Sequence, residues 1–322
     1  MTWLVTGGAG YIGSHVVASF VRQGLPVVVL DDFSTGVRSF VPKGVPLVEG
    51  TLLDTDVVEA ALRDHSVEGV IHIAGFKFAG ISVEQPLHTY EQNVTAMMSL
   101  LRAMERVGVM KIVFSSSSSV YGNAASGLVG EDHPFNPTSP YGESKVIGEW
   151  LLRNQGVAKG ITHTSLRYFN VVGSASTLLP DVSPHNLFSM VFAGLERGEA
   201  PIIFGHDYDT PDGTCIRDYI HVGDLADAHV AAASRMNRGD AIEPAYNVGS
   251  GTGTSVADMM SSIASVTGND FTPTPGARRA GDPARVVASG ELATRDLAWA
   301  MTHSLEDMIA SAWEARKTLA AL

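Results

Sequence analysis

The chain has 322 residues, of which 45% are hydrophobic and 17% charged, enough for one large α/β domain with a smaller lobe. Its formal net charge of −12 argues against nucleic acid or an anionic membrane surface as the main partner. The single cysteine, Cys215, excludes an internal disulfide and fits a reducing compartment.

Nothing in the sequence predicts export or membrane insertion. The N-terminal segment MTWLVTGGAGYIG has no positive side chain before Arg22, and no small-residue cleavage site follows an apolar run. No segment approaches the roughly 20 uncharged apolar residues that a membrane-spanning helix needs. We therefore expect a cytoplasmic protein.

Short apolar, β-branched runs alternate with helical stretches along the first half of the chain. Strands are predicted at Trp3–Thr6, Val27–Leu30, Val45–Val48, Val70–Ile73, Lys111–Ser115 and Thr164–Tyr168. Helices are predicted at Tyr11–Gln23, Asp56–Asp64, Val83–Val107 and Tyr141–Asn154. This alternation predicts an α/β fold with a doubly wound parallel sheet of the Rossmann type and right-handed crossovers.

After about residue 170 the rhythm loosens. Prolines from Pro180 to Pro283 punctuate shorter elements, which is typical of a smaller second lobe, here predicted as a C-terminal α/β substrate lobe. One late helix is predicted at Met308–Leu319, because Ser304 can serve as its N-cap with Asp307 three residues on.

A glycine-rich turn, GGAGYIG, follows the first strand and opens the first helix. Gly8, Gly10 and Gly13 fit the G-x-G-x-x-G pattern, and Gly7 extends it to G-x-x-G-x-x-G. Such glycines allow a tight turn and let a pyrophosphate approach the helix N-terminus. The second strand ends at Asp31, where a carboxylate binds a ribose diol and repels a 2′-phosphate, so NAD is predicted rather than NADP.

The stretch SPYGESK places Tyr141 and Lys145 four residues apart, on one face of a predicted helix. A free tyrosine, with a pKa near ~10, is a poor base at neutral pH. A nearby ammonium favours the phenolate, and a positive nicotinamide ring adds to that effect. The serine run at 115–119 directly follows the strand KIVF, so a hydroxyl is expected at the same sheet edge. Together these groups could take a hydroxyl proton while NAD takes the hydride.

The glycine-rich turn, the serine run and the Tyr141–Lys145 pair together are more specific for one family than any one of them alone. The sequence resembles the extended short-chain dehydrogenases/reductases and, within them, the UDP-galactose (UDP-glucose) 4-epimerases over almost its whole length. The matching stretches are VTGGAGYIGSH, LDDFSTG, VIHIAGFK, NVTAMMSLL, VFSSSSSVYG, SPYGESK, LRYFNVVG, IIFGHDYDTPDGTCIRDYIHVGDLADAHV and RRAGDPA.

The resemblance implies a UDP-hexose 4-epimerase that oxidises C4 transiently with NAD and returns the hydride to the other face of a 4-keto intermediate. It implies Ser117, Tyr141 and Lys145 as catalytic residues. It implies a cofactor site made of Gly7, Gly10, Tyr11, Ile12, Gly13, Asp31, Asp32, Phe33, Ser34, Thr35, Gly36, Thr51, Leu52, Ile73, Ala74, Gly75, Lys77, Asn93, Ser115, Tyr141, Lys145 and Phe169. Residues 1–170 would then form the NAD-binding domain, with later segments returning to it.

Residues 171–322 would mainly form the lobe that binds the UDP-sugar. The resemblance implies substrate contacts from Lys77, Ser117, Tyr141, Asn170, Asn186, Leu187, Ile202, Phe204, Arg217, Tyr219, Arg279, Asp282 and Val286. Arg217 and Arg279 make physical sense as clamps for a diphosphate in an acidic chain. The family also implies a homodimer, formed through helices at Val83–Val107 and Tyr141–Asn154.

Among the positions that depart from the family pattern, two concern ligand binding. Thr51 stands where the family usually has an aspartate that contacts the adenine, so the affinity for NAD is in question. Val286 aligns with a wall position near the substituent at C2 of the sugar, where a bulky tyrosine is associated with rejecting N-acetyl sugars. Val286 therefore suggests room for N-acetylhexosamines.

Other functions stay open. A nucleotide-sugar 4,6-dehydratase would need an Asp-Glu pair where Ser118 and Ser119 stand, and a UDP-glucuronate epimerase would need a cation for the sugar carboxylate. A non-catalytic NAD or nucleotide-sugar sensor would tend to lose the base or its lysine. His185, His206, His221 and His229 show no metal-ligand spacing, so no metal is expected.

Overall fold

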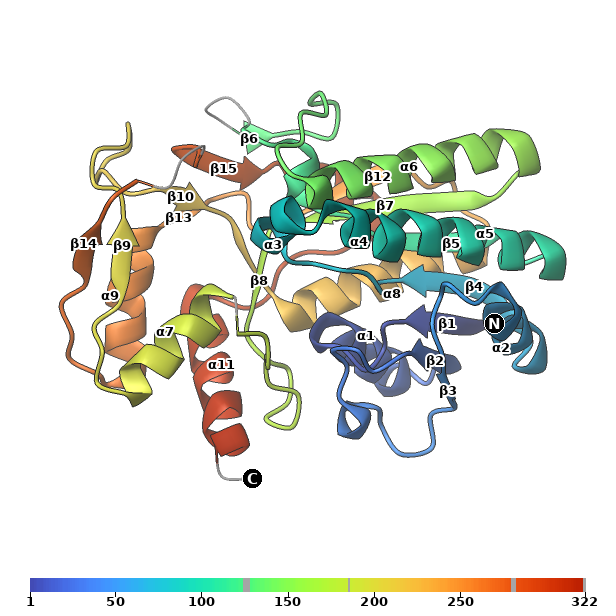
Figure 1. The fold of residues 1–322 in the computed structure, drawn as a ribbon, viewed down its shortest axis with the longest axis horizontal. Helices are drawn as coiled ribbons and strands as arrows, with labels where there is room; N and C mark the ends of the chain where they lie inside the picture. The colour runs from blue at the N-terminus through green and yellow to red at the C-terminus, as the bar shows by residue number, and fades with distance from the viewer. Residues whose placement is uncertain (124–127, 185, 279–281, 321–322) are drawn as a thin grey trace.

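The structure is a computed structural model that describes residues 1–123, 128–184, 186–278 and 282–320. In Figure 1 a large sheet and its helices lie at the right, and a smaller group of short strands and helices lies at the left. None of the helices in these ranges is both long and apolar enough to cross a membrane.

The large sheet has seven strands, and every neighbouring pair is parallel. Its order is β12 (Ala245–Val248), β7 (Thr162–Tyr168), β5 (Lys111–Ser115), β4 (Val67–His72), β1 (Thr2–Thr6), β2 (Val27–Asp31) and β3 (Leu47–Glu49). The order runs one way from β1 to β3 and the other way from β4 onward. The doubly wound parallel fold is thus confirmed, and ligands are expected where the order reverses, between β1 and β4.

Alternate strand residues bury into opposite helical layers. Val5, Val29 and Ile71 pack with α1 (Tyr11–Arg22) and α8 (Val222–Arg238) on one face. Their neighbours Leu4, Val28 and Val70 pack with α2 (Thr55–Asp64), α5 (Ala96–Val107) and α6 (Pro140–Lys159) on the other. Strands covered on both faces read as continuous apolar runs, which is why VVVL and its equivalents could be recognised in the sequence.

The smaller lobe is built from short pairings. A four-stranded sheet has the order β13 (Thr254–Ser255), β10 (Ile216–Arg217), β15 (Arg285–Ala288) and β6 (Leu128–Val129). Two further pairs are β11 (Tyr219–His221) with β8 (Asn170–Val172), and β14 (Thr274–Gly276) with β9 (Ile202–Phe204). The helices are α7 (Leu187–Glu196), α9 (Val256–Thr267), α10 (Glu291–Leu297) and α11 (Leu305–Ala320). Side chains from α7, α9 and α11 share one apolar core.

The predicted helix Val83–Val107 is wrong as a single element. The chain forms α3 (Ala79–Glu84), breaks at Gln85, and resumes as α4 (Pro86–Tyr90), a π-helical turn at Glu91–Thr95 and then α5. Gln85 has φ −127° and ψ 58°, outside the α region, because the ring of Pro86 excludes helical geometry at the preceding residue.

The strand predicted at Lys111–Ser115 was found with the same ends, and the other predicted elements were found with shifted ends. The helix predicted at Tyr141–Asn154 extends to Lys159, and the third strand begins at Leu47 rather than Val45. Two short 3₁₀ helices, η1 (Arg38–Phe40) and η3 (Ser118–Val120), were not predicted. The predicted capping of α11 is confirmed, since the Ser304 Oγ accepts from the Asp307 amide and the Asp307 carboxylate accepts from the Ser304 amide.

Candidate active site

A cavity of about 880 Å³ opens at the carboxyl edge of the large sheet, at its switch point. Its lining comes from the glycine turn after β1, the segments after β2, β4 and β5, the start of α6, and residues of the smaller lobe from β8, α7 and α11. This volume lies in the upper part of the range of small-molecule sites. The cavity therefore lies between the large sheet and the smaller lobe.

The glycine turn leaves no space for larger side chains. Gly7 has φ +71°, and a Cβ on Gly13 would lie 2.0 Å from the Gly7 carbonyl oxygen. The turn therefore packs tightly against the start of α1. Gly10 caps that helix without any side-chain hydrogen bond, so first-turn amides remain for an anion in the cavity.

Asp31 fixes two loops at the end of β2, in the wall of the cavity. One carboxylate oxygen accepts from the Ala9 amide at 2.9 Å, and the other accepts from the Phe33 amide at 2.9 Å. Burial raises the pKa of this carboxyl, and the two amide hydrogen bonds oppose that shift. Beside it, the Thr51 hydroxyl accepts from the Leu53 amide at 3.2 Å, a hydrogen bond within its own loop.

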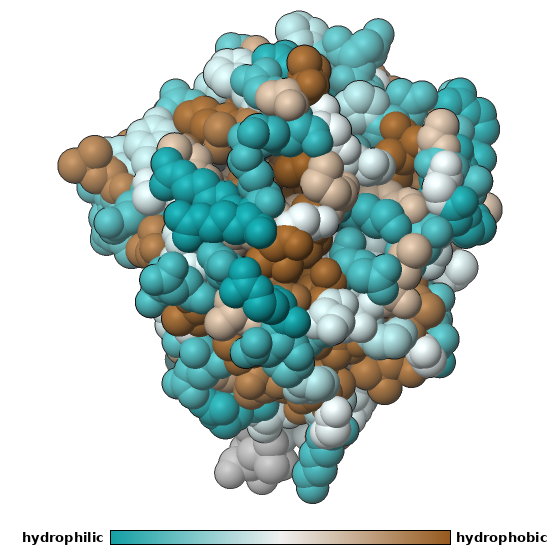
Figure 2. Space-filling view, turned by 90° about the vertical axis from the view of Figure 1, so that its right-hand side faces the viewer, coloured by the Kyte–Doolittle hydropathy of each residue, from teal (hydrophilic) through white to brown (hydrophobic). Residues whose placement is uncertain are grey.

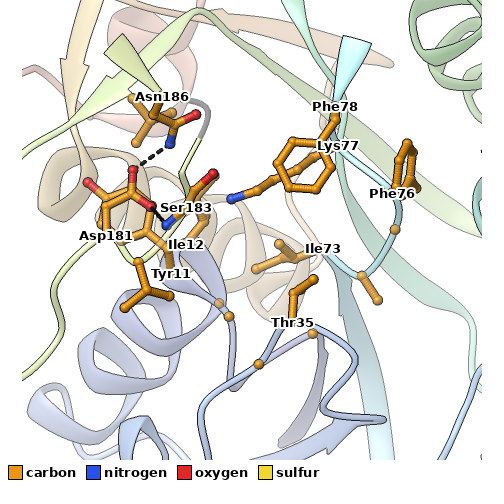
Figure 3. Close-up of a pocket in the computed structure, with 18 of the residues that line it drawn as sticks. Tyr11, Ile12, Thr35, Ile73, Phe76, Lys77, Phe78, Asp181, Ser183 and Asn186 are labelled. Carbon is orange, nitrogen blue, oxygen red and sulfur yellow. Dashed lines mark hydrogen bonds between the residues drawn. The ribbon is translucent and has the colours of Figure 1, made fainter. Parts of the chain in front are cut away.

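The segment after β4 contributes Lys77 to the cavity. Figure 3 shows the Lys77 side chain extending across the open space toward Ser183, on the opposite wall. Asn93 holds this segment in place, because its side chain accepts from the Phe76 amide at 2.6 Å and donates to the Phe76 carbonyl at 2.9 Å. Asn93 lies behind the wall and does not line the cavity.

Ser117, Tyr141 and Lys145 lie together in the cavity wall, and all three are buried. The Lys145 Nζ lies 5.7 Å from the centre of the Tyr141 ring and donates to the Ser115 carbonyl at 2.8 Å. The Ser117 hydroxyl donates to the Ser119 hydroxyl at 3.1 Å and accepts from the Ser119 amide. A tyrosine, an ammonium and a hydroxyl are thus within reach of one bound molecule.

Burial shifts the pKa of both ionisable groups. It raises the pKa of Tyr141, and the Ser117 hydrogen bond opposes this only in part. Burial lowers the pKa of Lys145 to about 8, against the opposing charge of Glu149. In the protein alone, burial therefore disfavours both the phenolate and the ammonium.

Much of the cavity wall on the smaller lobe was not predicted. Asp181, Ser183 and Arg316 line it, together with Phe188 and Phe192 of α7. Figure 3 shows the Asp181 carboxylate bonded to the Asn186 side-chain amide and to the backbone amide of Ser183. No motif marks this segment in the sequence, and its position depends on the packing of α7 and α11.

Several predicted substrate residues lie outside the cavity lining. Arg217 forms an ion pair with Asp282 at 3.2 Å, and Val286 lies opposite Arg217 in the β10–β15 pairing. Ile202 and Phe204 lie on β9. Phe33 and Ser115 of the predicted cofactor set are also not part of the lining, and Arg279 falls outside the described residues. By contrast, Asn170, Leu187, Tyr219 and Phe169 are part of the wall.

The profile of the NAD dependent epimerase/dehydratase family matches residues 3–249. The chain belongs to this family. It is 43% identical to a UDP-glucose 4-epimerase of Azospirillum brasilense over 97% of this chain and 91% of that protein.

Solved structures of the same family superpose closely. A UDP-glucose-4-epimerase from Stenotrophomonas maltophila, with bound NAD and formylated UDP-arabinopyranose, has a TM-score of 0.93 at 35% identity, covering 100% and 99% of the two chains. A UDP-Glc/GlcNAc 4-epimerase from Campylobacter jejuni has a TM-score of 0.86 at 34% identity, covering 98% and 99%.

One group of metal-type ligands occurs among the described residues. His221, Asp224 and His303 bring potential ligand atoms within 4.8 Å of one another. The two imidazole rings stack at 3.8 Å with 14° between their planes, so their in-plane lone pairs do not converge on one point. The His221 Nδ1 already accepts from the Gly223 amide, which makes it the cap of α8. Ring stacking and helix capping account for this group.

Proposed function

We propose that this chain is a UDP-glucose 4-epimerase, an NAD-dependent isomerase that interconverts UDP-galactose and UDP-glucose. The observation that supports this most strongly is the meeting of Ser117, Tyr141 and Lys145 with the glycine turn in one cavity. The similarity to named UDP-glucose 4-epimerases over nearly the full length supports the same conclusion.

The residues present fit NAD. The turn where a Cβ on Gly13 would strike the Gly7 carbonyl, the uncapped start of α1, and the carboxylate of Asp31 suit a pyrophosphate and a ribose diol. When bound there, NAD would supply a hydride acceptor and return the hydride. We assign residues 1–170, except β6, together with β12 and α8, to the cofactor-binding domain, because β12 and α8 pack on the large sheet and β6 pairs in the smaller lobe.

The chain's own groups would handle the proton. Tyr141 accepts the proton of the sugar's 4-hydroxyl, and Ser117 donates a hydrogen bond to the same oxygen. Lys145 stabilises the tyrosinate by its positive charge. The buried setting of all three keeps water away from the keto sugar. Ser119 bonds to the Ser117 hydroxyl where a dehydratase would need an acid, which favours epimerisation over elimination.

We assign the UDP part of the substrate to the smaller lobe. Asn170, Asn186, Leu187 and Tyr219 line the cavity on that side, and Arg217 of β10 precedes Tyr219 by two residues. The Asn186 side-chain amide donates to the Asp181 carboxylate, and its oxygen can still accept a hydrogen bond from a nucleotide sugar.

The test is conversion of UDP-galactose by the purified protein, measured as UDP-glucose with a coupled dehydrogenase. We expect UDP-glucose to form, with NAD added if the purified protein does not retain it, and we expect no net NADH when the coupling dehydrogenase is left out. Tyr141→Phe should lower kcat by at least about a hundredfold, because it removes the general base. An unchanged circular dichroism spectrum and Tm in that variant are the control for folding. No conversion by the wild-type protein, with NAD present, would refute the proposal.

We propose N-acetylhexosamines as further substrates. Val286 is buried in a cluster with Phe169, and Phe169 lines the cavity, so the size of residue 286 affects that wall. Val286→Tyr should lower turnover of UDP-N-acetylglucosamine while sparing UDP-glucose. Absence of any wild-type activity on the acetylated sugar would contradict this.

We also propose a cytoplasmic homodimer. Apolar side chains are exposed on α3, α4 and α6, the helices that cover the segments expected at the dimer interface: Val83, Leu87, Trp150 and Val157. Figure 2, which views the molecule from the right-hand side of Figure 1, shows hydrophobic residues interspersed with hydrophilic ones on that side of the molecule. Light scattering should give twice the chain mass, and Val157→Glu should lower it. The buried free thiol of Cys215 suits a reducing compartment.

A further inference from the structure

Glu149 lies on the same face of α6 as the proposed base and its lysine. Tyr141, Lys145 and Glu149 are spaced four residues apart, so their side chains follow one another along one side of the helix. All three are buried, and Glu149 is only 8% exposed. Glu149 does not line the cavity, so it has no direct role in contacting a ligand.

A buried arginine holds the Glu149 carboxylate from β7. Arg167 donates through Nε at 3.0 Å and through its terminal nitrogen at 2.6 Å, which gives a two-pronged ion pair. Its remaining nitrogen donates to the Tyr121 hydroxyl at 2.8 Å and to the Glu131 carbonyl at 2.9 Å. Buried ion pairs contribute little net stability, so a fully bonded one is better explained by what it positions.

The carboxylate also bonds to the serine run. The Ser116 hydroxyl donates to Glu149 Oε1 at 2.6 Å, and the Ser116 amide donates to the Leu166 carbonyl at 2.9 Å. Ser116 stands between Ser115, whose carbonyl accepts from Lys145, and Ser117. Glu149 therefore fixes the position of Ser116. Through Ser116 it also restrains the neighbouring Ser115 and the proposed catalytic Ser117.

The charge of Glu149 acts on Lys145 as well. Burial lowers the pKa of Lys145 to about 8, and Glu149 is the group that opposes this shift. Without a negative charge one helical turn away, the buried ammonium would lose its proton at a lower pH.

We propose that Glu149 is a positioning residue for the epimerase reaction: through Ser116 it fixes the place of Ser117, and through its charge it keeps Lys145 cationic. This inference rests on the proposed function. It assigns Arg167 the task of holding Glu149 in its buried position.

Two variants separate the two effects. Ser116→Ala removes the bond to the serine run and leaves the ion pair intact, and we expect kcat for UDP-galactose to fall about tenfold with KM unchanged. Glu149→Gln keeps an oxygen that can accept from Ser116 but removes the charge. In that variant we expect the alkaline limb of the kcat–pH profile to move to lower pH by about one unit.

Tyr121→Phe is the matched control. It removes a partner of Arg167 on the side of the network away from Glu149, so it should lower Tm but leave kcat and the pH profile as in the wild type. Ser116→Ala decides the proposal even where Glu149→Gln yields no folded protein, because it disturbs no charge.

The outcomes are distinct. A wild-type protein that converts no UDP-galactose refutes the proposed function itself. An active wild type with full kcat in Ser116→Ala overturns the positioning role, as does a Glu149→Gln variant that is active with an unmoved alkaline limb. A shift of the limb in Tyr121→Phe as large as that in Glu149→Gln would also overturn it, since any loosening of the network would then suffice.

Discussion

Four buried histidines should make the stability of this protein sensitive to mild acid. His15, His72, His221 and His229 are each at most 2% exposed. Burial lowers the pKa of His72 to about 3 and that of the other three to about 4. An unfolded chain has histidines near 6.5, so it binds protons that the folded chain excludes. The stability is thus fully present above pH 6.5 and falls as the pH drops toward 4.

The size of the effect follows from these values. Between pH 7.5 and pH 5.5, each such histidine removes about 1.3 kcal/mol from the free energy of unfolding, and the four together remove about 5 kcal/mol. That is a large share of the roughly 5–15 kcal/mol by which folded proteins are stable. Urea unfolding at the two pH values, followed by circular dichroism, measures the difference directly.

A single substitution identifies the source. His229 bonds to the Leu225 carbonyl at 2.9 Å and lies 2.7 Å from the Ser115 hydroxyl, and a glutamine can replace part of these contacts. His229→Gln should reduce the loss between the two pH values by about 1.3 kcal/mol. His206→Gln, at an exposed position, should leave the loss unchanged. Equal losses in wild type and His229→Gln would refute the reasoning.

Three further predictions concern the cofactor site. Gly13→Ala should abolish NAD binding measured by calorimetry, because its Cβ would lie 2.0 Å from the Gly7 oxygen; normal affinity would contradict the assigned turn. Thr51→Asp should lower the Kd for NAD about fivefold, because it adds a charged acceptor for the adenine amino group. An unchanged Kd would place the adenine elsewhere. Asn93→Ala should weaken NAD binding about tenfold, because Phe76 loses both of its hydrogen bonds to the Asn93 side chain. Equal affinity would show that the segment after β4 keeps its position without these bonds.

The parts of the structure that the sequence predicted well are those specified by neighbouring residues. The glycine turn needs small residues at fixed offsets, and Asp31 ends a strand that is apolar on both faces. The cap of α11 lies within four residues, from Ser304 to Asp307. In each case the physical cause is local, so the pattern is visible without the fold.

The features that were not predicted depend either on contacts between distant parts of the chain or, in one case, on a proline whose effect on the helix was not considered. Pro86 stands in the printed sequence, and its effect on Gln85 divides the predicted helix. Asp181 and Arg316 reach the cavity because α7 and α11 share an apolar core, and no local pattern records that packing. Arg167 and Glu149 are eighteen residues apart, and only the β7–α6 arrangement reveals them as partners.

The Tyr141–Lys145 spacing indicated the chemistry but not its energetic balance. The spacing predicts an ammonium that stabilises a phenolate, whereas in the folded chain burial raises the pKa of Tyr141 and lowers that of Lys145. A buried site disfavours the Tyr141 phenolate and the Lys145 ammonium when either is charged alone. It favours them as a pair, because the attraction between opposite charges is stronger at low dielectric. The negative charge of Glu149 opposes the lowering of the Lys145 pKa. The burial that excludes water from the site therefore acts together with a buried carboxylate, Glu149, which lies one helical turn from Lys145 and is paired with Arg167.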